Sequence, residues 1–192
     1  MKQLLFASLF LPMFACAQVL TGFNEGYILT NNNDTLYGLL KLRNKIPYKI
    51  FPRIQFKKTA EAEVESFAPA EVKGFTMGME IYESKYVSAK KTEKVFFQLK
   101  IKGYLSYYEN ESYAGPNTGS FYTVFLQKEN AEDFFVYQEN NPFFPFKRKL
   151  SEYLKDYPEL ASKVRHYKYN QTHIVRIVNE YNEYMAAKQL QQ

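Results

Sequence analysis

The two histidines of the chain stand seven residues apart. On one unbroken helix His166 and His173 would share a face, where two imidazoles can hold a metal ion. Asn170 lies between them and is a residue type that begins helices, and no cysteine or carboxylate stands at ligand spacing beside them. We therefore predict ordinary surface or interhelical histidines, no metal site and no cofactor.

A second candidate for chemistry is the pair Glu109 and Glu111 in the segment YYENESY. On a strand the two carboxylates would lie on one side, about 6–7 Å apart. Paired carboxylates hydrolyse glycosidic bonds, but no other group accompanies these two, and a solvated turn explains them as well. The chain also lacks the G-x-S-x-G, P-loop, G-x-G-x-x-G and H-E-x-x-H motifs. We predict no catalytic residue.

Aromatic side chains dominate the composition, with 17 Tyr, 17 Phe and no Trp. Exposed tyrosines form stacking platforms for glycans or peptides, whereas buried ones fill the core of a sheet. A domain of this size cannot bury all of these rings, so some must be exposed. The predicted ligand-binding patch consists of several exposed rings among Tyr104, Tyr107, Tyr108 and Tyr113.

The segment TNNNDTLYG, from Thr30 to Gly38, gathers three asparagines and an aspartate between two apolar runs. Asn and Asp tolerate left-handed backbone and cap their own turns, so a hairpin loop accounts for all four. Gly38 then belongs to the second strand and marks a bulge or a close backbone approach.

The elements that must position these residues change character once, near residue 146. Before it apolar and polar residues alternate as in strands, and after it apolar residues recur every three or four positions as in helices. Strands are predicted at 26–30, 35–43, 53–57, 72–77, 80–87, 94–102, 121–127 and 133–138. The apolar face of the strand at 94–102 continues past Gly103 into Leu105 and Tyr107. We expect either a three-residue loop, which would pair Leu99 with Tyr107 and Ile101 with Leu105 and keep this face intact, or a kink at Gly103.

Helices are expected from Lys147 onward. Pro158 suits the first turn of the second helix, and Asn170 suits the cap of the third. The third helix has one apolar stripe, formed by Ile174, Ile177, Val178, Tyr181 and Met185. Strands first and helices last predict an α+β fold, with an antiparallel β-sheet of several hairpins followed by two to three C-terminal helices.

The first 17 residues, MKQLLFASLFLPMFACA, differ from the rest of the chain. Lys2 precedes an apolar run too short to span a bilayer, and small residues follow it, which is the order of a secretory signal peptide. We predict cleavage after Ala17, which leaves 18–192 as a single mature domain, β-rich over 18–146 and helical over 147–188. In the alternative, Cys16 is the lipidated residue of a lipoprotein, although bulky Phe14 fits that pattern poorly.

The predicted compartment and the charge limit the partners. The mature protein would be extracytoplasmic, in the periplasm, on the outer surface or secreted, with no transmembrane segment and no nucleic-acid partner. Its formal net charge falls only from +5 to +4 when Lys2 is removed. The charge is unevenly spread, with seven bases and no acid over 35–60, then six acids and one base over 61–83. Two charged faces that neutralise each other explain this, and an anion-binding or membrane-surface patch is the alternative.

Three segments resemble a family of uncharacterised secreted proteins of the Bacteroidota: GYILTNNNDTLYGLLK, FFQLKIKGYLSYYE and LSEYLKDYPELASKVRHYKYNQTHIVRIVNEYN. In that family a strand, a polar turn ending in Asp-Thr and an apolar strand open the domain, and a helix with a following Asp-x-Pro and a terminal Tyr-Asn helix close it. The resemblance implies no activity and no functional residue. Secreted proteins of these bacteria carry O-glycans at Asp-Thr-aliphatic acceptors, so Asp34-Thr35-Leu36 makes Thr35 a predicted modification site.

The function predicted from the sequence is a secreted or periplasmic non-catalytic protein that binds an unknown ligand through an aromatic-rich sheet face or loop. The sequence identifies no partner, and the two partner classes considered are an envelope glycan and a protein. A cell-envelope hydrolase and a lipid-anchored envelope scaffold are the alternatives.

Overall fold

The computed structural model describes residues 22–42, 53–87, 91–115, 119–139, 141–166 and 168–191, without the side chains of 112–115, 119 and 120. Cys16 and the predicted cleavage site at Ala17 lie outside the described residues. Within them, ten strands come first, and three α-helices with one 3₁₀ turn follow. Every strand pair is antiparallel, so the predicted α+β fold is confirmed.

The ten strands form one sheet in the order β10-β9-β8-β7-β6-β5-β1-β2-β3-β4. They are β1 (Asn24–Thr30), β2 (Thr35–Leu42), β3 (Ile54–Lys57), β4 (Glu65–Phe67), β5 (Val72–Met77), β6 (Glu80–Tyr86), β7 (Lys94–Ile101), β8 (Leu105–Gly115), β9 (Gly119–Lys128) and β10 (Phe135–Gln138). Two meanders, β1 to β4 and β5 to β10, join where β5 returns to pair with β1. The sheet therefore has two edges, β4 and β10, and the short strand β4 was not predicted.

The asparagine-rich segment is the turn between β1 and β2, as predicted. Asn33 has a φ of 70°, in the left-handed region that asparagine tolerates. The Thr30 N–H donates to the Asp34 carbonyl oxygen at 2.9 Å, and the Asn31 side chain donates to the Ala70 carbonyl oxygen at 3.0 Å. The turn itself thus accounts for these polar residues.

The two faces of the sheet can be followed from strand to strand through the pairing. Phe96 on β7 and Tyr107 on β8 lie on one face, because Gln98 stands directly opposite Glu109. This face is called the inner face. Phe97 and Tyr108 lie on the other, called the outer face.

The inner face of the N-terminal strands packs on itself. Gly26 and Gly38 stand opposite each other on β1 and β2. A Cβ on Gly38 would lie 2.3 Å from the Lys57 carbonyl oxygen and 2.6 Å from the Phe56 ring, so the ring fills the space that a side chain would need. This close approach at Gly38 was predicted and is confirmed. The core formed here consists of Ile28, Leu40, Ile54, Phe56, Val72, Phe75, Tyr82 and Phe96.

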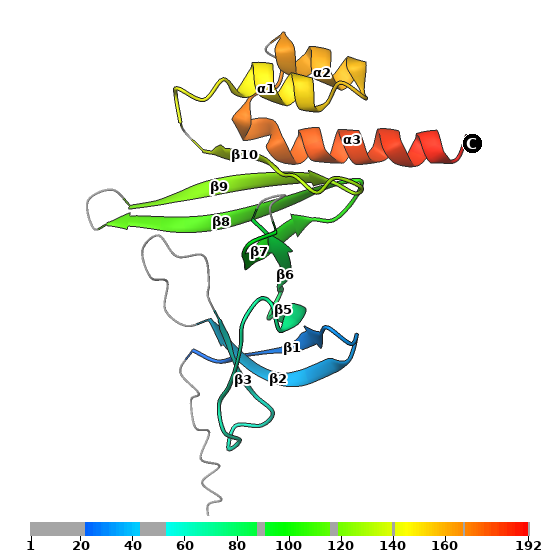
Figure 1. The fold of residues 1–192 in the computed structure, drawn as a ribbon. Coiled ribbons are helices and arrows are strands. Elements are labelled where there is room, and N and C mark those ends of the chain that lie inside the picture. Colours follow the sequence, from blue (N-terminus) through cyan, green and yellow to red (C-terminus); the bar gives the residue numbers. More distant parts are fainter. Residues whose placement is uncertain are drawn as a thin grey trace, which may run out of the picture.

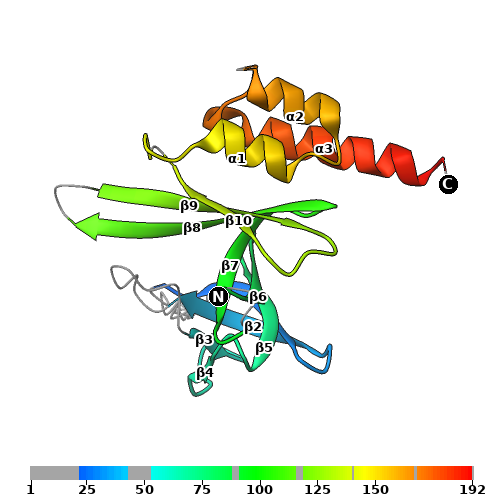
Figure 2. The same cartoon turned by 45° about the horizontal axis from the view of Figure 1, so that its top comes forward.

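Helices cover the inner face of the C-terminal strands. Helices α1 (Phe146–Tyr153), α2 (Pro158–Arg165) and α3 (Ile174–Gln189) lie on the same side of β8, β9 and β10 (Figure 1, Figure 2). Helix α3 is attached to the start of β8 by Asn182, whose Oδ1 accepts the Leu105 N–H at 2.7 Å and whose Nδ2 donates to the Leu105 carbonyl oxygen at 3.1 Å. A second core is thereby enclosed between the strands and the helices.

The helix boundaries follow the predicted signals. Pro158 occupies the first turn of α2. Asn170 caps the 3₁₀ turn η1 (Gln171–His173), which leads directly into α3, and its side chain accepts the Thr172 N–H at 3.0 Å. The predicted stripe of α3 faces the core, with four of its members buried and Met185 partly buried. These predictions are confirmed.

The loop between β7 and β8 has the expected three residues, but the predicted register is wrong. A bulge between Leu99 and Ile101 puts Leu99 opposite Tyr108 and Ile101 opposite Tyr107. Ile101 therefore changes face and packs against the core under the helices, whereas Leu99 stays on the outer face. The reason is that a bulge adds one unpaired residue and shifts the alternation beyond it.

Candidate functional site

The two histidines have separate structural surroundings. Helix α2 ends at Arg165, so His166 and His173 do not share a helix. His166 is exposed, whereas His173 Nδ1 accepts the Asn170 N–H at 3.3 Å and completes the cap of η1. The described residues contain no group of three or more side chains that could hold a metal ion.

The carboxylate pair on β8 faces the inner side, as the alternation predicts. Lys100 Nζ lies 3.3 Å from Glu109 Oε2, and the Tyr107 hydroxyl donates to Glu109 Oε1. Glu111 stands opposite Tyr122 on β9. Glu109 is thus held by a cation and a hydroxyl from its own sheet, which is the arrangement of a structural carboxylate.

The predicted tyrosine patch is not formed by Tyr107 and Tyr108. They lie on opposite faces of β8 and are 3% and 0% exposed. Tyr104 is partly buried against the core under the helices, and its hydroxyl donates to Gln189 on α3. The Tyr113 side chain lies outside the described residues. The prediction is wrong for the two buried rings because both faces of β8 are covered, the inner one by the helices and the outer one by Phe134.

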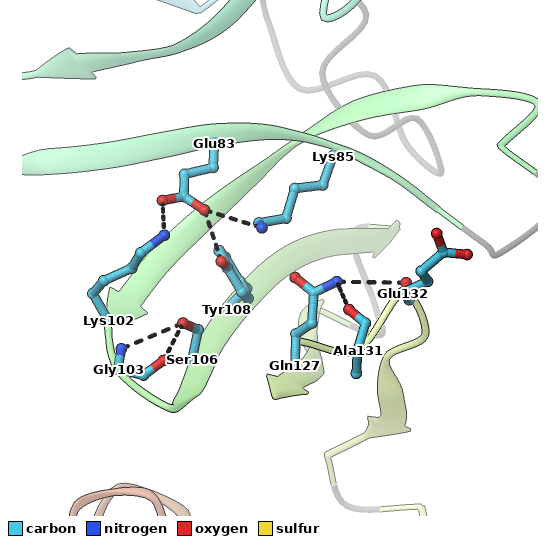
Figure 3. Close-up of polar contacts among 9 residues, drawn as sticks. All are labelled: Glu83, Lys85, Lys102, Gly103, Ser106, Tyr108, Gln127, Ala131 and Glu132. Atoms are coloured by element: carbon cyan, nitrogen blue, oxygen red, sulfur yellow. Dashed lines mark hydrogen bonds and ion pairs between the residues drawn. The ribbon is translucent and has the colours of Figure 1, made fainter. Parts of the chain in front are cut away.

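Phe134 lies at the end of the loop between β9 and β10, which folds over the outer face. Its ring centroid is 5.0 Å from that of Phe97 and 5.9 Å from that of Tyr108. Gln127 Nε2 fixes this loop by donating to the Ala131 carbonyl oxygen at 3.0 Å, as Figure 3 shows. Tyr108 is therefore buried against the rings of Phe97 and Phe134, and Lys85 Nζ lies 5.3 Å from its ring centroid.

The Tyr108 hydroxyl belongs to a polar network centred on Glu83 of β6 (Figure 3). It donates to Glu83 at 2.7 Å, Lys102 Nζ donates at 2.6 Å, and Lys85 Nζ lies 3.4 Å away. Burial raises the pKa of Glu83, but the donors from Lys102 and Tyr108 and the charge of Lys85 outweigh burial and lower this pKa below its ordinary value. Each carboxylate oxygen has a donor, so this network connects β6 to β8 and holds no free acid or base.

The most exposed tyrosine of the described strands is Tyr37 on β2, and Tyr86 on β6 and Tyr122 on β9 are about 40% exposed. Tyr27 and Tyr37 are cross-strand partners with ring centroids 5.7 Å apart, and Tyr37 is 72% exposed. Tyr27, but not Tyr37, lines a hollow of about 330 Å³ over β5 and β6, where Gly74 contributes no side chain. Alternation along β2 puts Tyr37 on the same face as Thr35 and Lys41, and this polar face is the signal in the sequence that could have identified a solvent-facing ring.

A larger groove lies between strand β10 and the helices α1 and α2, and it is called the β10 groove. Its volume is about 770 Å³. Its walls carry four aromatic, four basic and one acidic side chain, which are Phe134, Phe135, Phe144, Tyr153, Arg148, Lys149, Lys155, Arg165 and Glu152. None of the four tyrosines of the predicted patch lines it. A second hollow of about 560 Å³ continues past Phe144 and Arg148 toward η1.

The charge of the β10 groove is unbalanced. Lys155 pairs with Glu152 at 3.4 Å, and Lys149 lies over the Phe144 ring at 5.0 Å. Among the residues that the structure describes, neither Arg148 nor Arg165 forms an ion pair. Two exposed guanidinium groups therefore stand beside aromatic walls, and no described acid pairs with them. The run Lys147-Arg148-Lys149 was visible in the sequence, but its place beside β10 depends on the fold.

One wall of the groove is an open sheet edge. The Glu139 N–H donates to the Tyr122 carbonyl oxygen at 2.9 Å, which makes these residues a hydrogen-bonded pair of the antiparallel ladder. Such pairs alternate with non-hydrogen-bonded ones, so Val136, opposite Phe125, belongs to the second kind. The N–H and C=O of Val136 consequently point away from β9, toward the groove.

The wall of the groove formed by Tyr153 is rigid and uncharged. Its hydroxyl donates to the Leu126 carbonyl oxygen at 3.3 Å and accepts the Lys128 N–H at 3.2 Å. Burial raises the pKa of Tyr153 to about 12, so the ring stays neutral at ordinary pH. The groove thus offers aromatic surface held in place by hydrogen bonds, exposed basic groups and a backbone edge.

Comparison with known proteins adds no relative: no family model matches the chain, and neither a curated protein nor a solved structure matches it. The resemblance to the secreted Bacteroidota family stays a prediction. None of the helices in the described part of the chain is both long and apolar enough to cross a bilayer.

Proposed function

We propose that the mature protein is an extracytoplasmic, non-catalytic binding protein that holds an anionic ligand in the β10 groove. The observation that carries this proposal is the pair Arg148 and Arg165, two guanidinium groups that form no ion pair with any described residue and stand in a groove walled by aromatic rings. Guanidinium groups bind carboxylates through charge-assisted, often bidentate hydrogen bonds.

The contacts of the other candidate residues support binding rather than catalysis. His173 completes a helix cap, Glu109 is held by Lys100 and Tyr107, and Glu83 is saturated with donors. A general acid or base needs a proton that it can exchange with a substrate. Side chains that already serve as structural partners are poorly suited to that task, which also weakens the alternative of a cell-envelope hydrolase.

The test is a titration of the isotope-labelled mature protein with a synthetic glutamate-rich peptide, followed by amide chemical shifts. The expected shifts cluster at β10, α1 and α2, and affinity falls as salt is added, because the contact is between exposed charges. Arg148→Gln/Arg165→Gln should weaken binding about tenfold or more, since two charge-assisted contacts are lost.

Two controls make the result specific. A lysine-rich peptide of the same length should not bind, and Lys168→Gln/Lys188→Gln, which removes two exposed charges outside the groove, should bind as the unaltered protein does. Equal binding by the arginine variant, or shifts gathered on another surface, would refute the proposal.

The compartment and the two modifications rest on the sequence. Intact mass of the protein from its native host should correspond to residues 18–192, and a diacylglyceryl mass on Cys16 would instead favour the lipid-anchored scaffold. Thr35 is exposed at the start of β2, so an O-glycan there would be sterically accessible. A peptide map that finds Thr35 unmodified would dispose of the glycan.

A further inference from the structure

We infer that the occupant of the β10 groove is the acidic sheet edge of a second copy of this chain, so that copies join head to tail with β4 of one beside β10 of the next. This inference rests on the proposed function, because it names the anion that the groove binds. The two strands are the opposite edges of one sheet, and each pairs with a single neighbour.

The edge at β4 carries Glu65 on the strand itself, and Glu61 and Glu63 lie in the turn and the residues that lead into it. Residues 60–66 read AEAEVES, and β4 begins within this segment. Glu61, Glu63 and Glu65 are exposed, and none of them forms an ion pair with another described residue. Val64, between two of them, is 49% exposed. In an extended chain Glu63 and Glu65 point to one side and Val64 to the other.

The β10 groove has the complementary arrangement. Arg148 and Arg165 stand on its helical wall and pair with none of the acids that the structure describes, and Val136 is 40% exposed on the strand itself. A strand laid along β10 would turn Glu63 and Glu65 toward the arginines and Val64 toward Val136. The alternating side chains of the two strands would thus match across the contact, with glutamates facing arginines on one side of the sheet and the two valines in contact on the other.

Backbone groups are available for such pairing. The N–H and C=O of Val136 point into the groove, as shown above. On β4, which pairs on one side only with β3, the Ser66 carbonyl oxygen accepts Arg53 Nη2 at 2.6 Å, so an added strand would meet the stretch that precedes Ser66, from Glu63 to Glu65. Addition of a strand to an open sheet edge combines main-chain hydrogen bonds with pockets for alternate side chains.

Charge also selects the orientation of the contact. Two β10 edges would bring four arginines together, and two β4 edges would bring the glutamates together, so pairing of like edges is repulsive. A contact between two different patches of the same chain is heterologous, and it builds a closed ring or a linear chain rather than a two-fold dimer. The association should therefore grow beyond two copies and should weaken with salt.

The test is sedimentation velocity of the mature protein over a wide range of concentration. The unaltered protein should form species larger than a dimer. Arg148→Gln/Arg165→Gln and Glu63→Gln/Glu65→Gln should each shift self-association to at least about tenfold higher concentration. Mixed in equal amounts, the two variants should give a dimer that does not grow, because each keeps only one intact edge.

A charge swap separates electrostatics from damage to the fold. The quadruple variant Arg148→Glu/Arg165→Glu/Glu63→Lys/Glu65→Lys should recover association that either charge-reversed pair alone loses. Lys168→Gln/Lys188→Gln serves as the matched control and should associate like the unaltered protein. Val136→Pro removes the outward N–H without removing a hydrogen bond to β9, so it should weaken association while the monomer stays folded.

The outcomes distinguish this inference from the proposed function. A monomer at every concentration, or an oligomer unchanged by Glu63→Gln/Glu65→Gln, overturns the inference. If the glutamate-rich peptide still binds the β10 groove in that case, the proposed function stands with a different anionic partner. If the glutamate-rich peptide does not bind the β10 groove either, both the inference and the proposed function are refuted.

Discussion

In the strands β1 to β3 and β5 the inner face of the sheet packs on itself, whereas in β8 to β10 the same face packs against three helices (Figure 1). The first solution needs residues without side chains, and Gly26 and Gly38 provide them at paired positions. The second needs amphipathic helices with an apolar stripe. One face of a single sheet can therefore be buried in two ways, by curling the sheet so that the face packs against itself or by packing helices on it. Glycines are the residues that tolerate no substitution in the first case, and buried apolar helix residues are those in the second.

The largest expected effect comes from the curled half. Gly38→Val should lower the free energy of unfolding by about 3 kcal/mol or more, because its Cβ would lie 2.3 Å from the Lys57 carbonyl oxygen. Tyr37→Val is the matched control, because it introduces valine at the adjacent position of β2, where the side chain points to the exposed face. Urea denaturation measures both, and a difference under about 1 kcal/mol would break the comparison.

In the covered half, Ile177→Ala should cost about 2–5 kcal/mol, because Ile177 is fully buried between α3 and the strands. The exposed neighbour Val175 provides the control, and Val175→Ala should change stability little.

Amide hydrogen exchange of the Ile177→Ala variant sharpens the comparison between the two halves of the sheet. Faster exchange confined to β8–β10 and the helices would mean that the two halves open separately, and uniform acceleration would mean one cooperative unit.

Asn182→Ala tests the attachment of α3 to the sheet. The Asn182 side chain satisfies both the N–H and the C=O of Leu105, so its removal leaves two part-buried groups unpaired at a cost of about 1–3 kcal/mol. Glu183→Ala, one position further on the exposed side of α3, is the control. Thermal denaturation of both variants gives the difference in stability, and equal midpoints would show that Asn182 does not stabilise the attachment of α3 to the sheet.

The smallest effect concerns the link between the halves on the outer face. The lowered pKa of Glu83 means that its charged form is favoured by folding, so its contribution is present above pH 4.5 and is lost as pH falls through the folded-state pKa. Glu83→Gln should therefore cost about 1 kcal/mol at neutral pH and less in acid. Glu129→Gln is an exposed control. A penalty that does not shrink with acid would refute the role of the charge.

Local chemistry explains which elements were predictable. The alternation of β1, β2, β5 to β7 and the β9–β10 hairpin, the cap at Asn170 and the proline of α2 each depend on neighbouring residues, and all appear in the structure. The β7–β8 register was missed because a bulge leaves no mark in a run of alternating residues. Strand β4 was missed because three residues give too short a pattern.

The site was harder to predict, because whether a side chain is exposed depends on what is packed over it. Tyr107 and Tyr108 looked like candidates for an exposed patch, yet the helices bury one ring and Phe134 the other. Arg148 and Arg165 are ordinary helix residues in the sequence, and only the docking of α1 and α2 beside β10 brings them to one groove.

The sequence by itself determined the strands, turns, caps and apolar stripes of this protein, because these depend on contacts within a few residues. Only the tertiary structure decided which faces are covered, that β5 returns to β1, and that a basic and an acidic edge lie at opposite ends of one sheet. These features depend on pairing between residues far apart in the chain, for which local propensity carries no information.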